Sequence, residues 1–289
     1  MLLPGAAPIA AKSAPFRRTA EPLERPGPNT GTGALSIGHE KASDSADIFS
    51  VRPIQEEYMA TIHLVGGEKG GVGKSVVARL LAQYMIDRDL PFIGFDTDRS
   101  HGALLRYYGD YASPTVIDSY QSLDAILETA SAQPERRILV DLAAQTHQPL
   151  SQWMEESGVL ELAAELGIAI RYWNVMDSGQ DSVDLLERLL DQFGARLDYV
   201  LVRNQVRDGE FVALDNSEAQ QRAQDLNATV VGLKRLHPPL MNKIDRNGYS
   251  FWAARNRTDA GSDTLNLLER QRLKVWLEHA YREIDAAQV

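Results

Sequence analysis

The chain has 289 residues, of which 44% are hydrophobic, and its formal net charge is −10. That length accommodates one large α/β domain with extensions or two small domains, and the composition is sufficient for a buried core. The sequence has no cysteine, which excludes disulfides, a cysteine nucleophile and an iron–sulfur cluster held by the chain's own thiolates. The acidic balance disfavours sequence-independent attraction to DNA phosphates, so a local basic patch could bind DNA but the net charge does not indicate it.

The first 58 residues differ in composition from the rest of the chain. Residues 1–58 hold more than half of the 13 prolines, together with many Ala, Ser, Gly and Thr residues, and show no sustained apolar period. We therefore expect a disordered tail over residues 1–58, followed by one domain over residues 59–289. Two interpretations of the tail stay open: the natural protein begins at Met59, or the tail tethers a partner.

The sequence also bears on where the protein resides. No apolar run approaches the ~20 residues that are needed to span a bilayer. Near the amino terminus, Lys12, Arg17 and Arg18 follow the apolar stretch, whereas the basic residues of a secretory signal precede it. We therefore expect a cytoplasmic protein.

A glycine-rich segment, Gly66-Gly67-Glu68-Lys69-Gly70-Gly71-Val72-Gly73-Lys74-Ser75, lies between a predicted strand at 62–65 and a predicted helix at 76–85. A strand, a glycine loop, Gly-Lys-Ser and a helix in that order predict a phosphate-binding loop. Glycine allows backbone angles that other residues avoid and leaves the loop interior open, so that amides converge on phosphate oxygens. Lys74 is expected to reach the β- and γ-phosphates, and Ser75 to place its hydroxyl on Mg²⁺. The residues predicted to bind nucleotide here are Gly70, Gly71, Val72, Gly73, Lys74, Ser75 and Val76.

Strands and helices alternate along the remainder of the chain. Further strands are predicted at 91–96, 137–141, 168–175, 199–204 and 229–233, and helices at 150–165, 180–193 and 263–285. This alternation predicts an α/β fold with a mostly parallel, doubly wound sheet and helices on both faces. The final helix has mixed charges opposite a modest apolar face, whereas a membrane-binding helix is normally more basic. We therefore expect this helix to pack against the sheet and do not expect it to bind a membrane.

Acidic residues follow two of the predicted strands. The strand at 91–96 ends in Asp96-Thr97-Asp98, and the strand at 137–141 ends in Asp141. Ligands bind at the carboxyl ends of strands in open α/β sheets, so these carboxylates are expected near the phosphate loop. Asp96, Asp141 and Ser75 form the predicted Mg²⁺ site, and Asp98 is expected to orient the attacking water. The alternative for Asp96 and Asp98 is a polar turn with an acidic cap.

The phosphate loop departs from the general pattern at its first position, where Glu68 replaces glycine. The residues that follow, Lys69-Gly70-Gly71-Val72-Gly73-Lys74-Ser75, resemble the deviant Walker A motif of the ParA/MinD ATPase family. The resemblance implies a P-loop NTPase fold, ATP and Mg²⁺ as ligands, and a homodimer on ATP binding in which Lys69 reaches the nucleotide of the other subunit. It also implies that Lys69, Lys74 and Asp98 are catalytic, and that a protein partner stimulates a slow ATPase.

Two later segments extend this resemblance to the base-binding part of the family's site. Members of the family place an asparagine after a late strand to contact adenine, and Asn204 matches that position. Their proline-bearing loop packs against the base, and Leu236-His237-Pro238-Pro239 is similar to it, which makes Pro238 and Pro239 predicted nucleotide contacts. The segment Leu142-Ala143-Ala144-Gln145 after Asp141 departs from the family, because it lacks the glycine often found in the switch.

A narrower resemblance involves four parts of the chain. The strand at 62–65, the Asp96-Thr97-Asp98 turn, Leu150-Ser151-Gln152-Trp153-Met154 and Arg270-Gln271-Arg272-Leu273-Lys274 are similar to TraL-type ATPases, which are encoded in plasmid conjugation and mobilisation regions.

These patterns together predict a nucleotide-dependent switch protein. ATP binding would promote a dimer and hydrolysis would release it, in DNA transfer, plasmid partitioning or cargo positioning. One alternative is a P-loop enzyme that phosphorylates a small molecule, although no motif for such a substrate is visible. A second alternative is a scaffold that binds nucleotide without hydrolysing it.

Overall fold

A computed structural model describes residues 60–100, 102–206, 209–258 and 264–289. The predicted tail over residues 1–58 and the alternative start at Met59 lie outside the described residues. Within the described part, no helix combines the length and the apolar content that crossing a bilayer requires.

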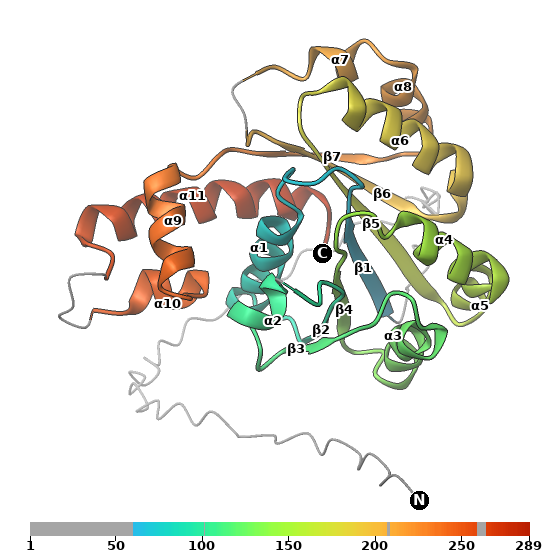
Figure 1. The fold of residues 1–289 in the computed structure, drawn as a ribbon, viewed down its shortest axis with the longest axis horizontal. Helices are drawn as coiled ribbons and strands as arrows, with labels where there is room; N and C mark the ends of the chain where they lie inside the picture. Colours follow the sequence, from blue (N-terminus) through green and yellow to red (C-terminus); the bar gives the residue numbers. More distant parts are fainter. Residues whose placement is uncertain (1–59, 101, 207–208, 259–263) are drawn as a thin grey trace, which may run out of the picture. The chain divides into compact units, whose positions relative to one another are not determined.

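One sheet of seven parallel strands organises the domain, in the order β3-β2-β4-β1-β5-β6-β7 (Figure 1). The strands are β1 Ala60–Gly66, β2 Phe92–Asp96, β3 Ala112–Pro114, β4 Arg137–Asp141, β5 Ile168–Met176, β6 Asp198–Asn204 and β7 Thr229–Leu233. All six pairings between neighbouring strands are parallel. The predicted α/β fold is confirmed, and the only strand of this sheet that was not predicted is the three-residue β3.

Helices cover both faces of the sheet (Figure 1). One face packs against α1 Lys74–Asp87, α2 Ala103–Tyr107, α9 Pro238–Arg246, α10 Phe251–Asn256 and α11 Leu267–Ala286. The other face packs against α3 Tyr120–Ala132, α4 His147–Glu156, α5 Val159–Glu165, α6 Gln180–Phe193, α7 Val212–Asp215 and α8 Glu218–Asp225. Each face has its own apolar core, since successive residues of a strand point to opposite sides.

The central strand shows why these segments form a parallel sheet. In β1, Ile62 and Leu64 belong to the core beneath α3–α6, whereas Val65 belongs to the core beneath α1 and α11. A strand that is buried on both faces is mainly apolar along its whole length, and this is typical of parallel sheets. The strands β4 and β5, which flank β1, are also buried along nearly all of their length, although β5 contains the polar residues Arg171 and Asn174.

Two predicted helices differ in detail from the structure. The predicted helix at 150–165 is two helices, α4 and α5, because the chain turns at Gly158 with φ of 58°, a left-handed conformation that glycine adopts readily. The predicted helix at 263–285 is α11, and its first predicted residue lies outside the described residues. The apolar face of α11 is buried against β7 and α10, as expected, and the Trp276 indole donates a hydrogen bond to the Lys234 carbonyl at 2.6 Å.

A buried arginine joins α1 to three other helices. The Arg79 guanidinium donates to the Asp245 carboxylate of α9 at 2.7 Å and lies 3.8 Å from the centre of the Tyr107 ring of α2. It also lies 4.9 Å from the centre of the Phe251 ring of α10. Since α1 begins at the glycine loop, these contacts fix the surrounding helices relative to the loop.

The topology brings the predicted site residues to one edge of the sheet. Asp141 at the end of β4 is in register with Asp96 at the end of β2 and with Val65 at the end of β1. The glycine loop therefore leaves β1 beside both carboxylates, at the carboxyl edge where open α/β sheets bind ligands.

Candidate functional site

Two of the three glycines that were expected to adopt unusual backbone angles do so in the structure. Gly71 has φ of 78° and Gly73 has φ of 96°, whereas Gly70 is not in the left-handed region. A side chain at Gly73 would also collide with the Asn204 amide nitrogen, so this position requires glycine for space as well as for conformation. Gly67, which was not singled out, has φ of 137°, and a side chain there would collide with the Val175 carbonyl.

Lys74 lies at the start of α1 and folds back over the loop. Its side chain is buried (7% exposed), and its ammonium donates to the Lys69 carbonyl at 3.1 Å. Burial lowers the pKa of Lys74, and the nearby carboxylates of Asp141 and Glu68 act in the opposite direction. The contact with the carbonyl uses one of the three donors of the ammonium, so the side chain is oriented while retaining donors for a phosphate.

Asp141 is the most perturbed acidic group of the site. Its side chain is 2% exposed, and within the described ranges neither carboxylate oxygen has a hydrogen-bond partner. Burial raises the pKa of Asp141 to about 8, the Asp96 carboxylate adds to the rise, and the nearby Ser75 and Lys74 oppose it. A buried carboxylate without a partner is unfavourable by itself, and a bound cation would relieve that cost.

The residues around Asp141 fit a magnesium ion. The part of the chain that the structure describes has no group of three or more His, Cys, Asp or Glu side chains that could hold a metal ion. Mg²⁺ in nucleotide sites is bound by one or two protein ligands together with phosphates and water, and does not need such a group. Asp141 and the Ser75 hydroxyl supply oxygen ligands of the kind that Mg²⁺ prefers.

Asp96 is held within the turn that it begins. Its Oδ1 accepts the amide of Asp98 at 3.0 Å and its Oδ2 accepts the amide of Leu105 at 2.9 Å. Burial raises the pKa of Asp96. These contacts give Asp96 the acidic-cap role that was the alternative for the turn, and its metal role stays a prediction.

The Asp98 side chain lies half-buried in the same turn. Its carboxylate accepts the amide of Ser100 at 2.9 Å.

Between the two aspartates, the Thr97 hydroxyl donates to the Asp141 carbonyl at 3.1 Å and accepts the amide of Ala143 at 2.8 Å. Thr97 therefore joins the turn after β2 to the segment after β4, a role that the sequence did not reveal because it depends on the pairing of these strands.

The segment after Asp141 is fixed at both ends although it contains no glycine. Gln145 has φ of 61°, a left-handed conformation that is uncommon for a residue with a side chain. The Glu68 carboxylate accepts the amide of His147, the first residue of α4, at 2.7 Å. Glu68 thus replaces the usual glycine of the loop with a residue that binds the helix leading away from Asp141. No sequence pattern signalled this pairing.

Lys69 is engaged within its own chain. Its ammonium lies 3.2 Å from the Asp177 carboxylate and 3.4 Å from the Asp181 carboxylate, after β5 and at the start of α6. The predicted contact of Lys69 with a second subunit stays a prediction, and it requires the lysine to leave both carboxylates.

A cavity of about 160 Å³ lies beside the loop. Val76, Asn204 and Pro238 line it, together with Trp276 of α11. Pro239 was predicted to contact the base, but it is not among the lining residues. Asn204 is 4% exposed and its amide nitrogen donates to the Val72 carbonyl at 2.7 Å, so this residue connects the cavity to the glycine loop.

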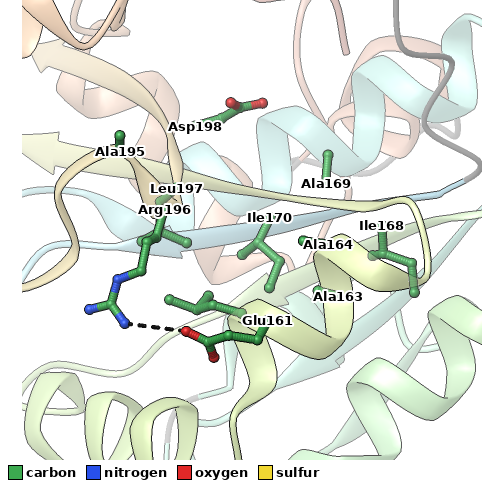
Figure 2. Close-up of a pocket in the computed structure, with 11 residues that line it drawn as sticks. Glu161, Ala163, Ala164, Ile168, Ala169, Ile170, Ala195, Arg196, Leu197 and Asp198 are labelled. Atoms are coloured by element: carbon green, nitrogen blue, oxygen red, sulfur yellow. Dashed lines mark ion pairs between the residues drawn. The ribbon is translucent and has the colours of Figure 1, made fainter.

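A second cavity, of about 320 Å³, lies at the opposite edge of the sheet. Figure 2 shows aliphatic side chains from α5, β5 and the turn before β6 around it, with the Arg196–Glu161 ion pair at 3.8 Å. It lies at the amino ends of β5 and β6, whereas open α/β sheets bind ligands at the carboxyl ends. The candidate site is therefore the loop edge.

Comparison with known proteins finds relatives at modest identity. No protein-family model matches the chain. Protein TraL of Escherichia coli is 27% identical over 243 residues, which is 80% of this chain and 100% of the relative. A second Protein TraL of Escherichia coli is 26% identical over 242 residues, which again is 80% of this chain and 100% of the relative. Protein MobD of Acidithiobacillus ferrooxidans is 26% identical over 148 residues, which is 50% of this chain and 63% of the relative. The predicted likeness to TraL is confirmed, and none of these names refers to ParA or MinD.

Proposed function

We propose that this chain is an ATP-dependent switch protein that acts in the conjugal transfer or mobilisation of DNA. The proposal that the chain binds ATP rests on the buried Asp141 carboxylate, which has no hydrogen-bond partner among the described residues and lies beside Lys74 and the amino end of α1. Phosphates satisfy the lysine and the helix end, and a divalent cation satisfies the carboxylate. The similarity to Protein TraL and Protein MobD supports the part of the proposal that concerns conjugal transfer or mobilisation.

Each residue of the loop edge has a separate task in this proposal. The amides of the glycine loop bind phosphate oxygens, Lys74 neutralises their charge, and Ser75 and Asp141 hold Mg²⁺. Mg²⁺, when bound, offsets the negative charge that develops as the terminal phosphate is transferred to water. Asp98 orients that water. The adenine occupies the cavity of about 160 Å³ that Asn204, Pro238 and Trp276 line.

The proposed nucleotide binding is tested by removing one ammonium group. Lys74→Ala takes away the charge that faces the phosphates, so we expect ATP binding to be lost, with a drop in affinity of at least about a hundredfold. Isothermal titration calorimetry with Mg²⁺ and ATP measures the affinity. Lys274→Ala, which removes the same charge from the exposed surface of α11, is the matched control. Equal affinity in Lys74→Ala and the control would show that ATP binds elsewhere or not at all.

Measuring ATP hydrolysis distinguishes the proposed switch protein from a phosphorylating enzyme and from a scaffold that only binds ATP. A switch releases phosphate from ATP without a small-molecule acceptor, and a phosphorylating enzyme requires that acceptor. A scaffold binds ATP but leaves it intact. Measurement of phosphate release by the intact chain therefore discriminates between the three, and Asp98→Ala should reduce the release while ATP binding persists.

A further inference from the structure

The segment between β4 and α4 contains a glutamine whose backbone conformation suits glycine better. Gln145 has φ of 61°, and its side chain is exposed. Across the described residues, its side-chain amide takes part in no hydrogen bond. A left-handed conformation is unfavourable for a residue with a side chain and costs glycine nothing. Residues held in such conformations cluster at active sites, so the glutamine side chain is a candidate for a task there.

Hydrogen bonds before Gln145 fix the segment to two strands of the sheet. The Leu142 amide donates to the Val65 carbonyl at the end of β1, at 3.0 Å. The Ala143 amide donates to the Thr97 hydroxyl in the turn after β2, at 2.8 Å. The chain therefore reaches Gln145 from the carboxyl edge of the sheet, next to the turn that contains the two predicted site aspartates.

Hydrogen bonds after Gln145 fix the segment to the glycine loop. The Thr146 hydroxyl donates back to the Ala143 carbonyl at 2.9 Å, which closes a short turn around Gln145. The His147 amide then donates to the Glu68 carboxylate in the loop at 2.7 Å. Gln145 is thus held, through its neighbours on both sides, between the turn after β2 and the glycine loop.

This place in the fold is where the proposed hydrolysis would occur. The glycine loop is proposed to bind the phosphates, and Asp98 in the turn after β2 is proposed to orient the attacking water. A carboxamide offers an acceptor oxygen and two donor hydrogens, so it can bind a water molecule and a phosphate oxygen at the same time. In other P-loop NTPases a glutamine orients the attacking water.

We propose that Gln145 holds the attacking water together with Asp98. The inference rests on the proposed ATPase function and adds a second residue to its hydrolytic step. The Gln145 carbonyl accepts one hydrogen of the water, Asp98 accepts the other, and the Gln145 amide nitrogen donates to an oxygen of the terminal phosphate.

The positioned water then attacks the terminal phosphorus. A bond forms between the water oxygen and this phosphorus, while the bond from the phosphorus to the oxygen that bridges it to ADP breaks. One proton of the water stays on the inorganic phosphate, and the other passes to solvent. Gln145 is unchanged at the end, because its contribution is to hold the water in line with the breaking bond.

Gln145→Gly tests the proposal, because glycine tolerates the left-handed conformation and the change removes only the side chain. We expect a melting temperature equal to or above that of the wild type, and an unchanged affinity for ATP by calorimetry. The rate of ATP cleavage in a single turnover, with protein in excess of ATP, should fall about tenfold or more. The matched control is Gln288→Gly, the same substitution at an exposed residue with φ of 50°, which should cleave ATP at the wild-type rate.

Gln145→Glu tests whether the donor hydrogens matter. Glutamate has the length of glutamine, but its carboxylate only accepts hydrogen bonds and is repelled by a phosphate. This variant should also lose at least about tenfold in the rate of ATP cleavage. A wild-type rate in Gln145→Glu would contradict the bond to the terminal phosphate.

The measurements distinguish failure of this inference from failure of the proposed function. If the wild type cleaves ATP and Gln145→Gly cleaves it at the same rate, the inference is wrong and the ATPase function stands. A loss of ATP affinity in Gln145→Gly that equals the loss of rate would also overturn the inference, because Gln145 would then act in binding. If the wild type neither binds nor cleaves ATP, the proposed function is wrong and the role of Gln145 is wrong with it.

Discussion

At the scale of single residues, the carboxyl group of Asp141 opposes folding because its charged form is buried. It is buried at the end of β4 without a hydrogen bond from the described chain, and its pKa is raised to about 8. An aspartate in an unfolded chain has its ordinary pKa of 3.8. Between these values the native protein binds more protons than the unfolded protein, so folding becomes less favourable as the pH rises.

We predict that Asp141→Asn raises the melting temperature of the nucleotide-free protein, and that the gain grows from pH 5 to pH 8. The amide cannot ionise, so the native variant avoids the buried charge. Each kcal/mol corresponds to about 2–4 °C in a domain of this size. Melting curves across this pH range measure the gain, with exposed Asp110→Asn as control. A lower melting temperature at pH 8 would contradict the unpartnered state of Asp141. The same variant should lose Mg²⁺-dependent ATP binding.

Burial of His63 in β1 makes the stability of the fold depend on pH in the opposite direction. Its ring is 1% exposed, accepts the indole N–H of Trp173 at 3.1 Å, and burial, followed by Arg171 and Arg137, lowers its pKa to about 3. An unfolded histidine has a pKa of 6.5, so the unfolded chain binds more protons between pH 6.5 and 3. His63 therefore contributes stability above pH 6.5 that is lost as the pH falls towards 3.

We predict that His63→Gln reduces the loss of stability between pH 7 and pH 4. Glutamine retains an acceptor for the Trp173 indole but does not titrate in this range. Urea unfolding at both pH values measures the difference in the free energy of unfolding. His279→Gln, at an exposed position of α11, should leave the loss unchanged. A loss in His63→Gln equal to that of the wild type would show that other groups dominate acid unfolding.

At the scale of elements, α4 receives a hydrogen-bond acceptor for its first amide from Glu68 of the glycine loop. The first amides of a helix have no partner inside the helix, and Glu68 binds one of them across a long separation in sequence. Its negative charge is also favourable at the positive end of the helix dipole. The hydrogen bond from His147 to Glu68 therefore links the loop to the segment after Asp141.

We predict that Glu68→Ala lowers the free energy of unfolding by about 1 kcal/mol, the usual effect of losing a helix cap. Glu68→Gln retains an acceptor oxygen, so it should cost less. Denaturant unfolding compares both with Glu128→Ala on the exposed surface of α3. If Glu68→Gln and Glu68→Ala were equally destabilised, the charge, and not the hydrogen bond, would be the contribution of Glu68.

The elements that could be predicted were those with a long local signal. The strands β1, β4, β5 and β6 are runs of mainly apolar residues, and the glycine loop defines its own conformation. β3 has three residues, Ala112-Ser113-Pro114, which show no period. The bonds of Thr97 to the segment after β4 and of Glu68 to His147 depend on segments that meet only in the folded chain. The site's residue types were therefore visible in the sequence, but most of their partners were not.

At the scale of the whole molecule, the proposed dimer competes with contacts inside one chain. Lys69 would have to leave Asp177 and Asp181 to reach a second nucleotide. The ion pair with Asp181 involves an exposed carboxylate and contributes little, so the pair with the buried Asp177 is the main contact to be broken. A nucleotide phosphate would compete for the lysine with a stronger charge.

We predict that Lys69→Ala keeps ATP binding but remains monomeric with ATP, because the variant cannot complete the second subunit's site. Asp98→Ala should instead accumulate as an ATP-bound dimer, since it retains the cationic groups but lacks the residue that orients water. Light scattering with and without ATP measures the mass of each variant. A monomeric Asp98→Ala protein, or wild-type hydrolysis by Lys69→Ala, would contradict the dimer mechanism.

The contact between Gly73 and Asn204 constrains how this protein can change during evolution. The Asn204 amide occupies the space that any side chain at position 73 would need, while holding the Val72 carbonyl. A side chain at position 73 would therefore displace the Asn204 amide, even though Gly73 lies in the glycine loop and Asn204 lies beside the cavity of about 160 Å³. In the proposed nucleotide site, the loop that binds phosphate and the cavity that holds the base would therefore have to evolve together at this contact.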